Sequence, residues 1–263
     1  MEDAGGKSAA SGNWAQLSGE GWSRLLQKQP QFADRCDWDK LNGFDLSCLL
    51  CEQPRFADRC DWSKLDGGNW ALLLSSHPQF SEHCDWSKLD GGNWASLIGN
   101  PNGLLFADKC DWSKLDGAGW YYILSAHPQF ADKCDWNKLD GHYWRMLLPT
   151  RMEFADKCDW SKLDERNWYG LVFERPELAE KCDVSKFSRK GILRLLGARG
   201  RGQVVALAHR VGECDFSTLT ASDWCDVLAV RPDLVDRFES STHDWEADKG
   251  PTPEDEKAAA LSW

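Results

Sequence analysis

The sequence predicts an all-α solenoid, a superhelical array of about nine repeats of 24 residues with two short helices each. Three observations support this fold class. The tripeptide Cys-Asp-Trp recurs six times between Cys36 and Trp160, at spacings of 24 residues and once of 26. Apolar residues within each copy follow the i, i+3, i+4 spacing of a helix, and no stretch alternates as a strand would. Such copies bury their apolar faces only by stacking on one another.

The repeat from Cys60 to His83 illustrates the expected elements. Asp66 is a favourable N-cap, and the helix that follows places Trp70 and two leucines on one face. Pro78 disfavours helix in the residue before it and suits the first turn of a second short helix, which would end near Cys84. A further turn, capped by the next aspartate, would then carry the tryptophan of Cys-Asp-Trp.

The array is predicted to cover residues 12–239, with divergent copies as caps at both ends. Residues 182–213 form an irregular copy, since 32 residues separate its cysteine from the next one. Residues 1–11 are polar, and residues 240–263 are acidic and contain two prolines. We expect both ends to be disordered.

A 24-residue unit with two short helices and a proline at the corner resembles the leucine-rich-repeat-variant class of bacterial α-solenoids. The resemblance covers roughly residues 12–239 in period and helix pattern. The repeated string Cys-Asp-Trp-Ser-Lys-Leu-Asp-Gly is this chain's own, so the resemblance implies a fold and no particular activity. That class includes a member type with a cysteine-ligated iron–sulfur domain, and the cysteines here form no matching cluster.

Eight of the 11 cysteines recur once per repeat and are interpreted as small buried thiols. Stacked copies lie about 10 Å apart, beyond the reach of a disulfide, so we expect a reducing, cytoplasmic location. Cys48 and Cys51 stand outside this pattern. They would lie one helical turn apart, either as a thiol or metal pair or as a chance occurrence at tolerant positions, and no second Cys-x-x-Cys completes a zinc site. No cofactor is expected.

The 16 tryptophans mostly occupy two repeated positions, which favours core packing over a sugar-binding platform. Residues flanking the helix tryptophan vary from copy to copy, and many of them should face solvent. Tyrosine and arginine, which are enriched at interface hot spots, cluster there in three successive copies, although neutral drift is the alternative explanation. The predicted partner-binding residues are Tyr121, Tyr122, His142, Tyr143, Arg145, Arg166 and Tyr169.

Residues 184–212 carry seven basic side chains and no acidic one, in a chain of net charge -11. They are Lys186, Arg189, Lys190, Arg194, Arg199, Arg201 and Arg210. Three interpretations stay open: a site for phosphate or nucleic acid, a site for the acidic tail or an acidic partner protein, and a solvated face balanced by neighbouring carboxylates.

Catalytic motifs are absent from the sequence. Gly6-Lys7-Ser8 lacks the earlier glycine of a phosphate-binding loop, and neither Gly-x-Ser-x-Gly nor His-Glu-x-x-His occurs. No apolar run reaches the roughly 20 residues that a membrane span needs, and no signal segment opens the chain. We therefore expect no enzymatic activity, no small-molecule substrate and no membrane partner.

The predicted function is that of a non-enzymatic scaffold or adaptor for a protein or peptide partner. It would display variable helix residues on a rigid, tryptophan-rich repeat frame. The alternative is a nucleic-acid- or phosphate-binding repeat protein that uses residues 184–212. The net charge of -11 opposes it, because nucleic-acid binding relies on Lys and Arg to neutralise phosphates. Carbohydrate binding ranks third.

Overall fold

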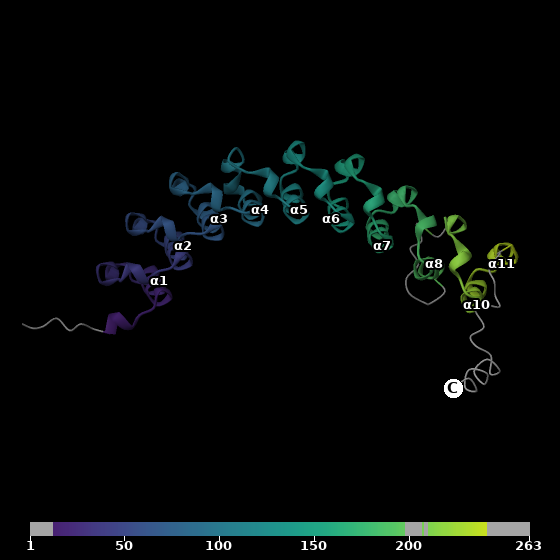
Figure 1. Cartoon of the computed structure of the whole chain (residues 1–263), viewed down its shortest axis with the longest axis horizontal. Coiled ribbons are helices and arrows are strands. Elements are labelled where there is room, and N and C mark those ends of the chain that lie inside the picture. The colour runs from purple at the N-terminus through teal and green to yellow at the C-terminus, as the bar shows by residue number, and fades with distance from the viewer. Residues whose placement is uncertain (1–12, 198–206, 208–209, 241–263) are drawn as a thin grey trace, which may run out of the picture. The chain divides into compact units, whose positions relative to one another are not determined.

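The computed structural model describes residues 13–197, 207 and 210–240. Every regular element in these ranges is an α-helix or a 3-10 helix, and successive repeats place like elements side by side (Figure 1). The predicted all-α repeat array is therefore confirmed. The predicted disordered ends lie outside the described residues apart from Ser240, as does part of the irregular copy 182–213.

The chain divides into two compact bodies, an N-terminal body that ends at Leu139 and a C-terminal body that begins at Asp140. The α-helices of the N-terminal body are α1 (Gly19–Lys28), α2 (Gly43–Glu52), α3 (Gly67–Ser76), α4 (Gly91–Gly99) and α5 (Gly117–Ala126). Its 3-10 helices are η1 (Asn13–Gln16), η2 (Pro30–Arg35), η3 (Trp38–Lys40), η4 (Pro54–Arg59), η5 (Trp62–Lys64), η6 (Pro78–His83), η7 (Trp86–Lys88), η8 (Pro101–Phe106), η9 (Trp112–Lys114), η10 (Pro128–Lys133) and η11 (Trp136–Lys138).

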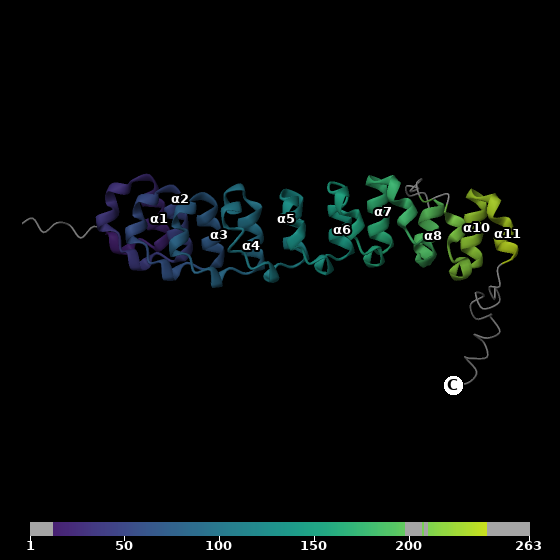
Figure 2. The same ribbon diagram turned by 90° about the horizontal axis from the view of Figure 1, so that it is seen from above.

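The C-terminal body continues the same order of elements within itself (Figure 2). Its α-helices are α6 (Gly141–Leu147), α7 (Glu165–Glu174), α8 (Arg189–Leu196), α10 (Ala221–Val230) and α11 (Val235–Glu239). Its 3-10 helices are η12 (Met152–Lys157), η13 (Trp160–Lys162), η14 (Pro176–Lys181), η15 (Val184–Lys186), η16 (Val211–Glu213), η17 (Phe216–Thr218) and η18 (Pro232–Leu234). None of the helices in these described ranges has both the length and the hydropathy that a bilayer crossing requires.

The second helix of each repeat is a 3-10 helix, which refines the expectation of two similar short helices. In η6 the Phe80 N–H donates to the His77 carbonyl at 3.2 Å, and the Cys84 N–H donates to the Ser81 carbonyl at 3.2 Å. Six residues beginning at a proline form fewer than two α-turns, and 3-10 bonding is common in such short pieces. The first helix is α-helical from its cap onward: Asp66 and Asn69 form a capping box at the start of α3.

The core is a row of tryptophans, leucines and phenylalanines shared between neighbouring repeats. Trp70 of α3 is 1% exposed and stacks on Trp62, with ring centroids 5.5 Å apart. Phe80 lies 5.5 Å from Trp62 on its other side. The helix tryptophans are thus core residues as predicted, whereas the tryptophans of Cys-Asp-Trp, such as Trp62, are only half-buried.

A lysine joins each repeat of the N-terminal body to the one before it. Lys88 Nζ donates to the carbonyl oxygens of Ser63 at 3.0 Å and Leu65 at 2.7 Å. The same bond pair recurs at Lys40, Lys64, Lys114 and Lys138. These lysines therefore have a structural role in joining repeats.

Candidate interaction surfaces

The outward face of helices α2–α5 in the N-terminal body carries almost no charge, in contrast to α1, where Glu20 and Arg24 form an exposed ion pair. The second and sixth residues of each helix point outward, and in α3 these are Gly68 and Leu72. Helices α3, α4 and α5 contain no charged residue at all. We call the outward side of α2–α5 the neutral face and define it by Phe44, Leu72, Ser96 and Tyr122, which are all exposed.

The 3-10 helices of the same body carry the charges that the neutral face lacks. Asp34 and Arg59, from η2 and η4, lie 3.5 Å apart and are both mostly exposed. Later copies place an aspartate and a lysine side by side, as in Asp132 and Lys133 of η10. Exposed pairs of this kind contribute little to stability but keep a surface well hydrated. The two sides of the N-terminal body therefore differ strongly in polarity.

Tyr122 and Tyr121 lie on or near the neutral face. The Tyr122 side chain is 52% exposed and rests against Gly99 of the preceding helix, where any side chain would collide with the tyrosine ring. Tyr121 is half-buried. Phe44, 62% exposed at the second position of α2, extends the apolar part of this face. Phe44 and Leu72 were not among the predicted partner-binding residues, although their positions in the helical repeat could have identified them.

In the C-terminal body, the predicted residues of α6 and α7 have mixed exposure. His142 and Arg166 occupy the outward second position of their helices and are exposed. Tyr143 and Arg145 are half-buried, and the Tyr143 ring lies edge-on to His142 with centroids 5.2 Å apart. The Arg145 guanidinium extends over Gly170 of α7, where a side chain at residue 170 would meet it.

The expectation of a solvent-facing Tyr169 is wrong. Its side chain is 5% exposed, its hydroxyl donates to the Gly191 carbonyl of α8, and its ring lies 5.4 Å from Phe187. Burial raises the pKa of the Tyr169 hydroxyl above its usual value. The residue after the helix tryptophan faces the next repeat: Ser23 donates to the Asp45 carbonyl in the equivalent place, at 2.9 Å. The small residues Ser23, Ala71 and Ala95 at this position were a signal of that contact.

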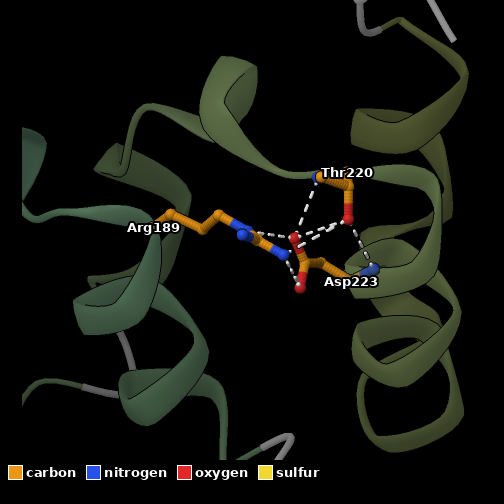
Figure 3. Close-up of polar contacts among 3 residues, drawn as sticks. All are labelled: Arg189, Thr220 and Asp223. Atoms are coloured by element: carbon orange, nitrogen blue, oxygen red, sulfur yellow. Dashed lines mark hydrogen bonds and ion pairs between the residues drawn. The ribbon is translucent and has the colours of Figure 1, made fainter. Parts of the chain in front are cut away.

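Three of the seven basic residues predicted as an anion site already have carboxylate partners. Lys186 Nζ lies 3.0 Å from Asp183. The Arg189 guanidinium donates to both oxygens of Asp223, at 2.5 and 2.9 Å (Figure 3). The third residue, Arg210, donates to Glu213 at 2.6 Å and to the carbonyls of Ala179 and Cys182. Arg189 and Arg210 thereby join separate segments of the C-terminal body, whereas Lys186 pairs locally on an exposed surface.

The carboxyl group of Asp223 is the most strongly perturbed acid in the described part of the chain. It is buried on α10, which would raise its pKa, but hydrogen bonds from Arg189 and Thr220 outweigh burial and lower that pKa to about 2. The group therefore stays ionised in neutral solution. It acts as a fixed negative anchor for Arg189 between α8 and α10 (Figure 3).

Lys190 and Arg194 are the two remaining described members of the predicted anion site. Both are exposed, at the second and sixth positions of α8. The Arg194 guanidinium carbon lies 4.7 Å from the centre of the Tyr169 ring, a cation–π contact. Arg199 and Arg201 lie outside the described residues. The structure thus divides the basic segment into residues that pair internally and residues that face solvent.

The cysteines of the repeat have weakly acidic thiols. Burial, with the negative charge of the following aspartate, raises the pKa of Cys60 and Cys84 to about 12. Burial also raises the pKa values of Cys48 and Cys51. Every cysteine is a free thiol. Within the described residues, no group of three or more His, Cys, Asp or Glu side chains is arranged to hold a metal ion.

A recess of about 420 Å³ opens beside η13 and η15 in the C-terminal body. Its apolar wall comes from Trp160, Trp168 and Phe187. Its volume suits a small ligand, but a binding site also needs polar groups that are free to orient one. Here Asp183 pairs with Lys186, and Glu165 accepts hydrogen bonds from Ser188. We therefore assign no ligand to this recess.

The fold and these surfaces define a helical-repeat protein with a repeat of about 24 residues. Comparison of the chain with protein-family models, with curated proteins and with solved structures gives no match. The surfaces must therefore be interpreted from their own chemistry.

Proposed function

We propose that the protein is a non-enzymatic scaffold that binds a protein partner through the neutral face of the N-terminal body. The observation that carries this proposal is the absence of charged residues from α3, α4 and α5, combined with exposed Phe44, Leu72 and Tyr122. Large apolar side chains exposed on an uncharged face are unfavourable in water and are typical of interaction sites.

A rigid array suits this role. Repeats joined through Lys88 and its equivalents present outward residues at a constant spacing, so a partner that spans several repeats meets a preformed surface. Tyrosine and phenylalanine contribute large contact areas with few rotatable bonds, which makes Tyr122 and Phe44 the expected hot spots.

The nucleic-acid alternative receives less support. Arg189 and Arg210 are engaged with Asp223 and Glu213, which lowers the number of cations available to neutralise phosphates. The carbohydrate alternative needs exposed tryptophans, and the tryptophans in the described repeats are buried or half-buried.

The proposal is tested by affinity purification of the full chain followed by mass spectrometry. The test variant is Phe44→Ser/Leu72→Ser/Tyr122→Ser, and the matched control is Leu105→Ser/Val230→Ser/Val235→Ser, which changes three exposed apolar residues elsewhere. We expect a partner that the wild-type chain and the control both retain and that the test variant loses. If the test variant keeps every partner of the wild-type chain, the neutral face is not the binding site.

A further inference from the structure

Helices α6, α7 and α8 bring together basic residues that are separated in the sequence. His142, Arg166 and Lys190 each occupy the exposed second position of their helix. Equivalent positions of neighbouring helices in a stacked array lie about 10 Å apart. The three side chains therefore form one row across the N-terminal turns of the three helices.

A second row of basic groups runs parallel to the first, one turn further along the helices. Arg194 is at the exposed sixth position of α8, and the Arg145 guanidinium covers the sixth position of α7, above Gly170. The Arg194 guanidinium lies over the Tyr169 ring, and this contact holds it in position. We call the five residues His142, Arg145, Arg166, Lys190 and Arg194 the basic stripe.

The carboxylates at the N-terminal turns of α6 and α7 accept hydrogen bonds from the backbone or from Ser188, and Glu174 lies at the opposite end of α7. Asp140 and Asp164 cap α6 and α7, and their side chains accept the backbone N–H of Tyr143 and Asn167. At α8 the cap is Ser188 in place of aspartate. Glu165 accepts from the N–H and the hydroxyl of Ser188, at 2.9 and 2.8 Å. Ion pairs in this part of the chain join Lys186 to Asp183 and Arg189 to Asp223, and neither uses a residue of the stripe.

An exposed aromatic side chain completes this surface. Phe173 is 79% exposed, the highest value among the large apolar residues of the described chain. It follows Arg166 by seven residues and therefore lies on the same side of α7. Cationic groups beside a solvent-exposed aromatic ring match a ligand that carries both carboxylates and an apolar group.

We propose that the basic stripe binds a short acidic segment of a partner protein, with Phe173 receiving an apolar side chain of that segment. A peptide is favoured over a nucleic acid because the cations cover only three helices. The chain as a whole has a net charge of -11, and acidic residues such as Asp156 and Asp183 are exposed on the 3-10 helices of the same body. A long polyanion would extend past the stripe and meet these carboxylates, whereas a short acidic segment would not.

The test measures binding of a fluorescein-labelled peptide of roughly twelve residues, rich in glutamate with a central leucine, to the full chain by fluorescence anisotropy. The test variant is Arg166→Gln/Lys190→Gln/Arg194→Gln. We expect its dissociation constant to rise by about tenfold. A second variant, Arg166→Gln/Lys190→Gln, retains the contact of Arg194 with Tyr169 and should weaken binding by about fivefold even if the triple variant folds poorly.

The matched control is Lys157→Gln/Lys181→Gln/Lys186→Gln, which removes three exposed lysines from the 3-10 helices of the same body. We expect binding within about twofold of the wild-type chain, because these lysines lie outside the stripe. Phe173→Ser should weaken binding of the peptide that contains leucine and leave binding of an all-glutamate peptide unchanged. Three outcomes would overturn the proposal: no binding by the wild-type chain, equal weakening by the control, or tighter binding of a single-stranded oligonucleotide of matched charge than of the peptide.

Discussion

In the N-terminal body a lysine of each repeat donates to backbone carbonyls of the preceding repeat, as Lys88 does to Ser63 and Leu65. In the C-terminal body the contact between α8 and α10 is instead an ion pair of two side chains, Arg189 and Asp223. The first kind of bond uses a backbone group that every residue has. The second requires a matched pair of residue types. The contact made by Lys88 can therefore tolerate change in the residues that accept, while the contact between α8 and α10 depends on two particular charges.

The same contrast extends to the outward faces. Helices α3–α5 have no charged residue, whereas α6–α8 carry the basic stripe. Both sets of helices keep a buried tryptophan or isoleucine at the fourth position, as Trp70 and Ile192 illustrate. One repeat frame thus supports two surfaces of different chemistry, because outward positions contribute little to the core.

The largest expected effect concerns the buried helix tryptophans, which are core residues in each body. Trp70→Ala and Trp224→Ala each remove a tryptophan that is 1% exposed and in contact with other aromatic rings. Each change should lower the free energy of unfolding of its own body by about 3–5 kcal/mol, through lost burial and a residual cavity. Hydrogen exchange with mass spectrometry would locate the loss of protection.

The control for the core comparison is Tyr122→Ala, an aromatic residue that is 52% exposed and should change stability by less than about 1 kcal/mol. If either tryptophan variant lost protection equally in both bodies, the expectation that each change destabilises only its own body would be wrong.

A smaller effect concerns the stability of the C-terminal body, which should depend on pH through Asp223. Because the pKa of Asp223 is about 2 in the folded chain, below its ordinary value of 3.8, its ionisation stabilises the C-terminal body above about pH 4. That stabilisation is lost as the pH falls through 2. Asp223→Asn should therefore lower stability by about 2 kcal/mol at pH 7, and the difference from wild type should vanish near pH 2. Urea unfolding followed by circular dichroism at several pH values measures it.

Asp183→Asn is the matched control for the pH series, since Asp183 pairs with Lys186 on an exposed surface and should have little effect at any pH. A difference in stability between Asp223→Asn and wild type that persisted unchanged at pH 2 would contradict the assigned role of the carboxylate.

The repeat period, the all-α fold and the burial of the helix tryptophans were predictable, because periodic apolar residues report packing directly. Tyr169 was not predicted correctly. It directly follows the helix tryptophan Trp168, a position that faces the next repeat, and here α8 covers it. The ion pair of Arg189 with Asp223 also escaped prediction, because 34 residues separate the partners and the irregular copy breaks the register between them.

The basic stripe illustrates a second limit of sequence reasoning. The sequence places Arg166 with the tyrosines of one predicted site and Lys190 with the basic segment of another. The structure brings them to equivalent positions of adjacent helices, because they are one repeat apart. Charge counted along the chain therefore grouped Lys190 with Lys186 and Arg210, although those two residues have carboxylate partners.

The smallest predicted effect tests the bond between N-terminal repeats. Lys88→Met keeps the length of the side chain and removes both donors to the carbonyls of Ser63 and Leu65. It should lower the stability of the N-terminal body by about 1 kcal/mol, since the bonds are charge-assisted but exposed to solvent. Lys109→Met is the control, as Lys109 contacts only an exposed neighbouring carboxylate, that of Asp108, at 3.6 Å. Equal losses for the two variants in urea unfolding would show that the bonds from Lys88 to the preceding repeat do not stabilise the N-terminal body.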